Sequence, residues 1–184
     1  MNNLFLRHGE VENPKNIHYS YLPGFNLSEK GKVQARKVGK NLNENFKISK
    51  IISSPLLRAR ETSKIINSFL KVEIEYSSNI LEWVGPYGWT GKTLSEIKLT
   101  KEHQIYKNSP EYKGYTSESL NSVFQRVLEK YERESNVLFV SHQDTIRSFF
   151  YHYLKESDFN INKPEHCEIQ CISSDNKLER FLVA

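Results

Sequence analysis

Two histidines and two arginines of this chain have types and positions that suit one kind of chemistry. Arg7 and His8 follow a short apolar segment, and His142 follows another. A neutral imidazole can attack phosphorus, and a guanidinium such as Arg7 or Arg58 offers paired N–H groups to phosphate oxygens, a geometry that lysine cannot reproduce. A phosphoryl group in transfer carries negative charge on its equatorial oxygens. These residues therefore favour phosphoryl transfer, with His8 as the nucleophile.

Strands that alternate with helices must position these side chains. We expect strands at residues 3–7, 50–53, 72–76, 136–141, 167–172 and 180–183. We expect helices at residues 28–45, 54–69, 94–106, 117–134 and from 144 onward. This alternation predicts an α/β fold: a three-layer sandwich with a mostly parallel central sheet and helices on both faces. Ligands bind such sheets at the carboxyl ends of the strands, which is where His8 and His142 fall.

Local signals mark several of these boundaries. Ser28 predicts a helix N-cap, and Ser54 followed by Pro55 predicts a second N-cap with proline at the first helical position. Gly9 is expected to let the backbone turn sharply after His8. Residues 81–91, rich in glycine and aromatic residues, predict an ordered functional loop.

Length and composition limit the function classes. The 184 residues suit a single domain spanning 1–184, with 38% hydrophobic and 26% charged residues. No apolar stretch is long enough to span a bilayer, which predicts no membrane partner. The net charge of +4 suits an anionic partner, but there is no basic stripe interleaved with aromatics, so we expect no nucleic-acid partner.

The remaining bulk features concern the cell compartment and the assembly. Cys167 and Cys171 form neither a zinc pattern nor a disulfide framework and are expected to be reduced packing residues. The N-terminus runs directly into an apolar stretch that carries Arg7 and His8, leaving no room for a cleavable signal, so we expect a cytoplasmic protein. The sequence leaves monomer and homodimer both open.

Four segments, in order and spacing, resemble the histidine phosphatase superfamily, also called the phosphoglycerate mutase-like family. They are residues 6–10 (LRHGE), residues 54–59 (SPLLRA) with Thr62, Glu82 ahead of a glycine and tryptophan loop, and residues 140–147 (VSHQDTIR). A lone Arg-His-Gly would be weak evidence. The agreement of all four segments, from residue 3 to about 150, is strong.

The resemblance implies a role for each matching residue. His8 would carry a phosphohistidine, Arg7, Arg58 and His142 would clamp the phosphate, and Glu82 would protonate the leaving oxygen. No metal and no organic cofactor is implied. Chemistry alone gives Glu82 the same role, because a leaving alkoxide needs a proton and a carboxyl group in a nonpolar loop is a natural donor.

Some positions depart from the family pattern. Gln143 and Asp144 stand where two glycines are usual, adding bulk and negative charge near the site entrance, although Asp144 could simply cap its helix. Asn13, predicted to bind substrate, comes one position early and directly before Pro14. Three loop aromatics could either roof the pocket or pack against the domain, and packing is the favoured alternative: Trp83, Tyr87 and Trp89.

Three functions remain open at this stage. The first is a phosphatase acting on a small phosphorylated metabolite, the second is a phosphoglycerate mutase, and the third is a non-catalytic phosphate-binding module. A mutase must retain a doubly phosphorylated intermediate, which calls for extra cations over the second phosphate. Between residues 91 and 141 there are no adjacent arginines, only Arg126 and scattered lysines at 92, 98, 101, 107 and 113 that resemble solvated helix faces. The phosphatase is therefore favoured.

Overall fold

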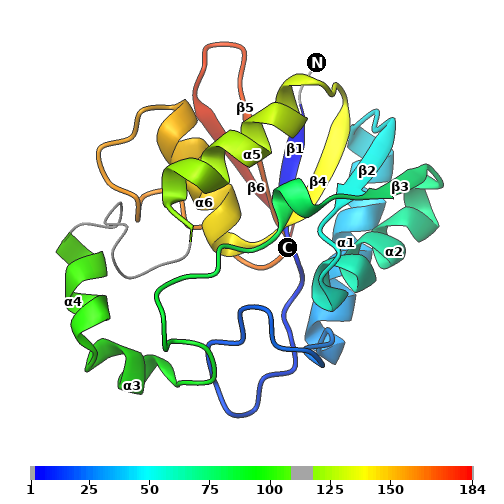
Figure 1. Cartoon of the computed structure of the whole chain (residues 1–184). Helices are drawn as coiled ribbons and strands as arrows, with labels where there is room; N and C mark the ends of the chain where they lie inside the picture. Colours follow the sequence, from blue (N-terminus) through cyan, green and yellow to red (C-terminus); the bar gives the residue numbers. More distant parts are fainter. Residues whose placement is uncertain (1–2, 109–117, 184) are drawn as a thin grey trace.

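A twisted mixed sheet forms the centre of the protein. The computed structural model describes residues 3–108 and 118–183. Four parallel strands lie in the order β3 (Glu73–Tyr76), β2 (Lys50–Ser53), β4 (Val137–Ser141) and β1 (Leu4–Arg7). Two antiparallel strands extend the sheet beyond β1, first β5 (Glu168–Ile172) and then β6 (Leu178–Leu182) (Figure 1). The predicted mostly parallel sheet is confirmed.

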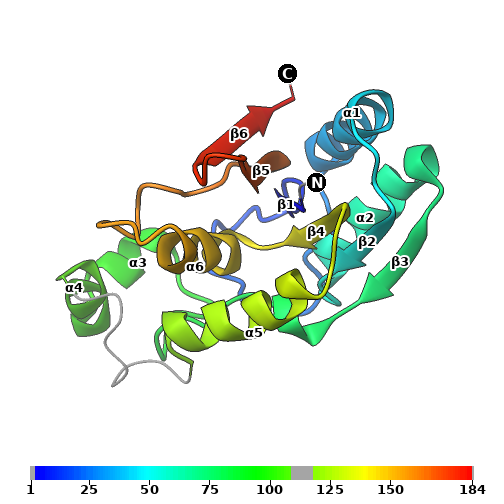
Figure 2. The ribbon, with the colours of Figure 1, turned by 90° about the horizontal axis from the view of Figure 1, so that it is seen from above.

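Helices cover both faces of this sheet. On one side lie α1 (Glu29–Asn45) and α2 (Leu57–Leu70), and on the other lie α5 (Leu120–Glu132) and α6 (Gln143–Tyr153) (Figure 2). Because successive strand side chains point to opposite faces, β1 sends Leu4 and Leu6 toward α1 and α2 and Phe5 toward α5 and α6. The three-layer sandwich predicted from the alternation of strands and helices is confirmed.

The carboxyl end of β1 lies unusually close to the start of α1. A methyl group added at Gly9 would come within 2.7 Å of the Gly31 carbonyl oxygen, and one added at Gly31 would come within 2.0 Å of the Glu10 carbonyl oxygen. Gly9 has no positive φ, so the expected sharp turn is not its reason. Glycine at both positions instead permits a close approach of two backbones. Ser28 caps α1 as predicted, accepting from the Gly31 N–H at 3.0 Å.

The start of α2 differs from the prediction. The helix begins at Leu57, three residues after Ser54, and Leu56 is its N-cap without a side-chain hydrogen bond. The hydroxyl oxygen of Ser54 accepts from the Leu56 N–H at 3.3 Å and lies 2.7 Å from Nε2 of His142. Ser54 therefore belongs to the edge of the sheet where the predicted site lies.

The single helix predicted at residues 94–106 is two helices, α3 (Leu94–Lys98) and α4 (Lys101–Asn108). They are separated at Thr100, whose hydroxyl oxygen accepts from the His103 N–H at 3.2 Å and so caps a new helix start. The predicted start of α5 at residue 117 lies outside the described residues, and Ser119 caps α5 by accepting from the Ser122 N–H at 3.1 Å. Of the helices in the described ranges, none is both long and apolar enough to cross a membrane.

Candidate active site

Each of the four parallel strands leads into one segment of the predicted site. His8 follows β1 and Ser54 follows β2. His142 follows β4 and occupies the N-cap of α6. Glu82 comes after β3 and a short 3-10 helix, η1 (Ser78–Ile80). The carboxyl edge of the sheet therefore gathers residues that are far apart in the sequence.

His8 is held in the tautomer that a nucleophile needs. Its Nδ1 lies 2.8 Å from the carbonyl oxygen of Gly9, which can only accept. Nδ1 therefore carries the proton, and Nε2 is unprotonated and keeps its lone pair. The Nε–H of Arg58 points at that lone pair from 3.2 Å. Burial, helped by Arg58 and Arg7, holds the pKa of His8 well below its usual value. The imidazole is therefore neutral at physiological pH.

Arg58 is a buried and firmly oriented cation. Only 2% of its surface is exposed, although it lies on a helix. Its Nη2 donates to the carbonyl oxygen of Ser20 at 3.0 Å, and its guanidinium stacks over the Tyr19 ring at 4.8 Å. An arginine fixed in this way can meet an anion with little further loss of conformational freedom.

Arg7 is oriented by the loop before β5. Its Nη1 donates to the Pro164 carbonyl oxygen and its Nη2 to Nε2 of His166, each at 2.9 Å. These contacts leave Nε of Arg7 as a buried donor without a partner among the described residues. Burial, with Arg7 next in effect, lowers the pKa of His166 to about 4, so this histidine is a neutral acceptor.

His142 supplies a second unused polar atom at the same place. Its Nε2 contacts the Ser54 hydroxyl, and its Nδ1 is buried with no partner in the described part of the chain. The Ser54 oxygen already accepts from a backbone N–H, so its own proton can go to Nε2 and leave the imidazole proton on Nδ1. The rings of His142 and His8 lie 5.2 Å apart. Unpaired buried donors are costly unless a ligand satisfies them, and Arg7 Nε and His142 Nδ1 suit an anion.

Glu82 has the properties of an acid that is still protonated near neutral pH. Its Oε1 accepts from the Trp83 N–H at 2.9 Å and from the Thr145 hydroxyl at 3.4 Å. Burial, followed by the nearby Asp144 carboxylate, raises the pKa of Glu82 to about 7. A pKa in this range suits a group that must give and then take a proton.

These groups surround one small cavity of about 140 Å³. Arg7, His8 and Glu82 line it, together with six residues that the sequence did not assign to catalysis: Ile17, His18, Tyr19, Ser20, Gln143 and Asp144. Arg58 and His142 lie next to His8, through the contacts given above. The structure thus brings together five of the six predicted site residues. The sixth is Asn13.

Asn13 lies elsewhere. Its amide nitrogen donates to the Ile17 carbonyl oxygen at 2.8 Å, and its amide oxygen accepts from the Ile17 N–H at 3.2 Å, so the side chain closes its own loop. It lines a larger outer pocket of about 590 Å³, which shares Arg7 and Tyr19 with the inner cavity. A contact of Asn13 with the phosphate itself stays a prediction.

The loop aromatics mostly pack. Trp83 is 2% exposed and donates its indole N–H to the Glu118 carbonyl oxygen at 2.7 Å, and Trp89 is 7% exposed. Tyr87 is largely exposed. Packing was the favoured alternative, and it is confirmed for both tryptophans.

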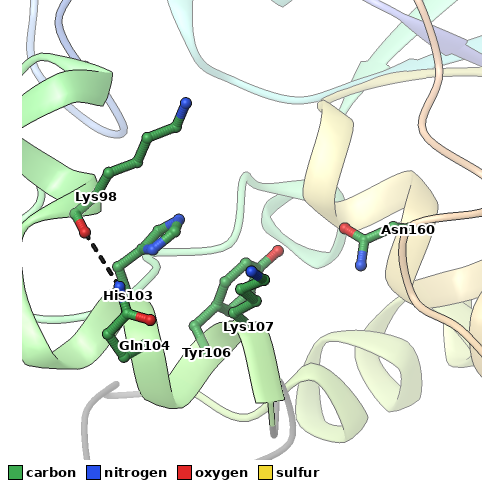
Figure 3. A pocket seen from close by; sticks show the side chains of 6 residues that line it. All are labelled: Lys98, His103, Gln104, Tyr106, Lys107 and Asn160. Carbon is green, nitrogen blue, oxygen red and sulfur yellow. Dashed lines mark hydrogen bonds between the residues drawn. The ribbon is translucent and has the colours of Figure 1, made fainter.

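Another hollow, of about 500 Å³, lies between α4 and Asn160 (Figure 3). Its lysines, Lys98 and Lys107, are exposed. The amide oxygen of Asn160 already accepts from Arg147 at 2.8 Å. None of the predicted site residues lines this hollow, so the inner cavity is the better candidate for the active site. Within residues 3–108 and 118–183, no three His, Cys, Asp or Glu side chains are grouped so as to hold a metal ion.

Comparison with known proteins agrees with this geometry. A family model described as the histidine phosphatase superfamily (branch 1) matches residues 4–181. The chain belongs to this superfamily. Among solved structures, the phosphoserine phosphatase of Entamoeba histolytica, solved with 3-phosphoglyceric acid, has a similar fold: the TM-score is 0.80 at 21% identity, over 97% of this chain and 94% of that one.

The curated relatives are more similar in sequence but match a smaller part of the chain. An uncharacterised Mycobacterium tuberculosis protein is 42% identical over 77 residues, which is 42% of this chain but only 38% of that protein. Phosphoserine phosphatase 1 of Hydrogenobacter thermophilus is 30% identical over 159 residues, covering 80% of this chain and 73% of that protein. Membership of the histidine phosphatase superfamily therefore extends over nearly the whole chain, while the activity and substrate remain to be proposed.

Proposed function

We propose that this protein hydrolyses phosphomonoesters of small metabolites through a phosphohistidine at His8. In the first step, Arg7 Nε, Arg58 and His142 Nδ1 hold the phosphate oxygens while Nε2 of His8 attacks phosphorus. The P–O bond to the alcohol breaks as the P–N bond forms, and protonated Glu82 gives its proton to the leaving oxygen.

In the second step, water attacks the phosphohistidine. The Glu82 carboxylate, deprotonated by the first step, takes a proton from the water as its oxygen bonds to phosphorus. The P–N bond breaks, Nε2 of His8 regains its lone pair, and inorganic phosphate leaves. Glu82 is protonated again, so the cycle closes without a metal or an organic cofactor.

One observation supports this proposal above the others. The hydrogen bond from His8 Nδ1 to Gly9 leaves the lone pair on Nε2, which accepts from Arg58, and two further buried donors of the site, Arg7 Nε and His142 Nδ1, have no partner within the described residues. Buried donor atoms of this kind are costly to leave unsatisfied if the site has only a structural role. The same observation disfavours a non-catalytic module, because binding alone does not require a fixed neutral nucleophile.

A mutase is less well supported by the surroundings of the cavity. Holding a second phosphate calls for additional cations. Arg7 is the one lysine or arginine among the described residues that line the inner cavity, and two carboxyl groups, Glu82 and Asp144, line it as well. Four of the lysines between residues 91 and 141 are exposed and do not line the inner cavity: Lys92, Lys98, Lys101 and Lys107. Lys113 lies outside the described residues.

The test is to trap the intermediate. Protein quenched rapidly during turnover of ³²P-labelled substrate should carry label on His8, in a bond that is stable in alkali and labile in acid, because it is a phosphoramidate. The His8→Ala protein should carry none. Label on serine or aspartate would contradict the mechanism. Isomerisation of 3-phosphoglycerate, primed with 2,3-bisphosphoglycerate, that outruns phosphate release would favour the mutase.

A further inference from the structure

Groups of opposite charge line the inner cavity. Arg7 lines it, and Arg58 lies behind His8. Glu82 and Asp144 also line it, and the Asp144 carboxylate is near enough to raise the pKa of Glu82, so we call the part of the cavity at these two carboxyl groups the acidic end. The proposed chemistry uses Glu82 directly, whereas Asp144 takes part in it only by raising the pKa of Glu82. A second carboxylate in the cavity can also act on the substrate itself.

Asp144 directs its charge toward the cavity. Its Oδ1 accepts from Arg147 Nη1 at 2.6 Å and from the Gln143 amide at 3.3 Å. Arg147 lies behind it, 4% exposed and absent from the cavity lining, with its Nη2 donating to Asn160. Burial acts to raise the pKa of Asp144, but Arg147, Gln143 and His18 together outweigh burial and lower that pKa. The ion pair therefore presents its negative end to the cavity.

A neutral polar group lines the same end. Burial lowers the pKa of His18, and its Nε2 is a buried atom without a partner among the described residues. His18 can thus donate to or accept from a ligand, but it adds no cation that would neutralise Asp144. Among the residues that the structure describes, every ionised group at this end of the cavity is an acid.

The size of the cavity decides which part of a substrate meets this charge. Its volume of about 140 Å³ is less than half of the ~300 Å³ at which ordinary ligand pockets begin. The phosphoryl group and the first atoms of the leaving alcohol fill it. A charged substituent one or two carbons from the ester oxygen therefore lies beside Asp144, where like charges repel strongly because little water separates them.

We propose that Asp144 is a specificity-determining residue: it selects phosphomonoesters whose alcohol carries an ammonium group close to the ester oxygen over those that carry a carboxylate or a second phosphate there. This inference rests on the proposed phosphatase function and deepens it by naming the substrate class. Gln143 and Asp144 are adjacent at the start of α6 and both line the cavity, so the charge of the acidic end can be altered at either position.

The test compares two substrates of matched length and opposite charge. O-phosphoethanolamine and 2-phosphoglycolate both have a two-carbon leaving alcohol, one with an ammonium and one with a carboxylate. We expect Asp144→Asn to lower the ratio of their kcat/KM values by about tenfold, which corresponds to about 1.4 kcal/mol. Any difference in leaving ability between the two alcohols cancels when the ratio in the variant is divided by the ratio in the wild type.

Controls separate this outcome from damage to the fold. Asp175→Asn removes an exposed carboxylate in the turn between β5 and β6 and should leave the ratio unchanged. If Asp144→Asn fails to fold, Gln143→Lys decides, because it places a cation at the acidic end without breaking the pair with Arg147, and it too should lower the ratio.

The outcomes are distinct. An unchanged ratio in folded Asp144→Asn, or in Gln143→Lys, would overturn the role of Asp144 while leaving the phosphatase intact. A wild-type protein that fails to hydrolyse 4-nitrophenyl phosphate would instead count against the proposed function.

Discussion

Glu82 offers the sharpest test of the proposed chemistry. Its Glu82→Gln variant keeps the shape and the hydrogen-bond acceptor of the side chain but has no proton to give to a leaving alkoxide. General acid catalysis contributes about 10²- to 10⁴-fold, so hydrolysis of an alkyl ester such as ethyl phosphate should slow by that factor. 4-Nitrophenolate leaves without a proton, so hydrolysis of 4-nitrophenyl phosphate should slow by less than about threefold.

The structure also sets the pH at which the acid works. With its pKa raised from 4.5 to about 7, half of Glu82 is protonated at pH 7. At the ordinary pKa only about one molecule in 300 would be protonated, so burial and Asp144 together increase the working acid about 150-fold at this pH. The advantage of wild type over Glu82→Gln on ethyl phosphate should therefore fall about tenfold per unit above pH 7.

The assay measures kcat/KM for both esters, in both proteins, from pH 5 to 9. Ionisation of the substrate affects both proteins equally, so its effect on pH dependence cancels in the ratio of the wild-type kcat/KM to the variant kcat/KM. The additional Asp144→Asn protein should show the decline at lower pH, because the Asp144 carboxylate raises the pKa of Glu82. An equal loss for the two esters, or a ratio that does not vary with pH, would assign the proton to another group such as Glu10.

Three further predictions concern stability and the clamp. Because the pKa of Glu82 is raised in the folded protein, its contribution to stability is complete below pH 4.5 and is lost as pH rises through 7. The free energy of chemical unfolding of Glu82→Gln should therefore rise relative to that of wild type over this range, by up to about 3 kcal/mol. Stability curves that stay parallel with pH would contradict this. Arg58→Lys should lower kcat/KM by an amount that corresponds to about 3 kcal/mol of transition-state binding. Arg133 is 71% exposed, and Arg133→Lys should leave kcat/KM almost unchanged. Equal losses in the two variants would refute the assignment of Arg58 to phosphate binding. His166→Ala releases Arg7 and should raise KM and the inhibition constant of phosphate about tenfold, with kcat less affected. His166→Gln should restore part of this loss. If it restores none, the role of His166 is purely structural.

Much of the fold follows from local sequence patterns. The strands predicted at residues 50–53 and 136–141 are present within one residue, because uninterrupted apolar runs indicate buried parallel strands whatever their partners are. The predicted helix boundaries are wrong where the side chain of a polar residue can form more than one kind of hydrogen bond. Ser54 resembles an N-cap, but its hydroxyl serves His142, and Thr100 starts a new helix inside an apparently continuous pattern.

Five of the predicted site residues come together because each lies at the end of a parallel strand or in the segment that directly follows one. The position of His166 could not be predicted in this way. It precedes β5, which runs antiparallel to β1, so the start of β5 lies at the same edge as the end of β1, and the Cys167 N–H donates to the Arg7 carbonyl oxygen at 3.0 Å. Nothing in the sequence around residues 163–168 says that this strand pairs with β1 or that it runs in the opposite direction.

The sequence predicts the charge of the cavity only in part. It indicates that Asp144 adds negative charge near the site entrance, but it leaves open the alternative that Asp144 simply caps its helix. In the structure His142 occupies the N-cap, and Asp144 lies in the first turn with its charge paired to Arg147 on the side away from the cavity. A cap would have directed the carboxylate to backbone N–H groups and left the substrate unaffected. Because the carboxylate instead lines the cavity beside Glu82, one side chain both raises the pKa of the acid and limits which alcohols can approach it. Catalysis near neutral pH and discrimination between leaving groups are therefore coupled in this protein, and Asp144→Asn should alter both together.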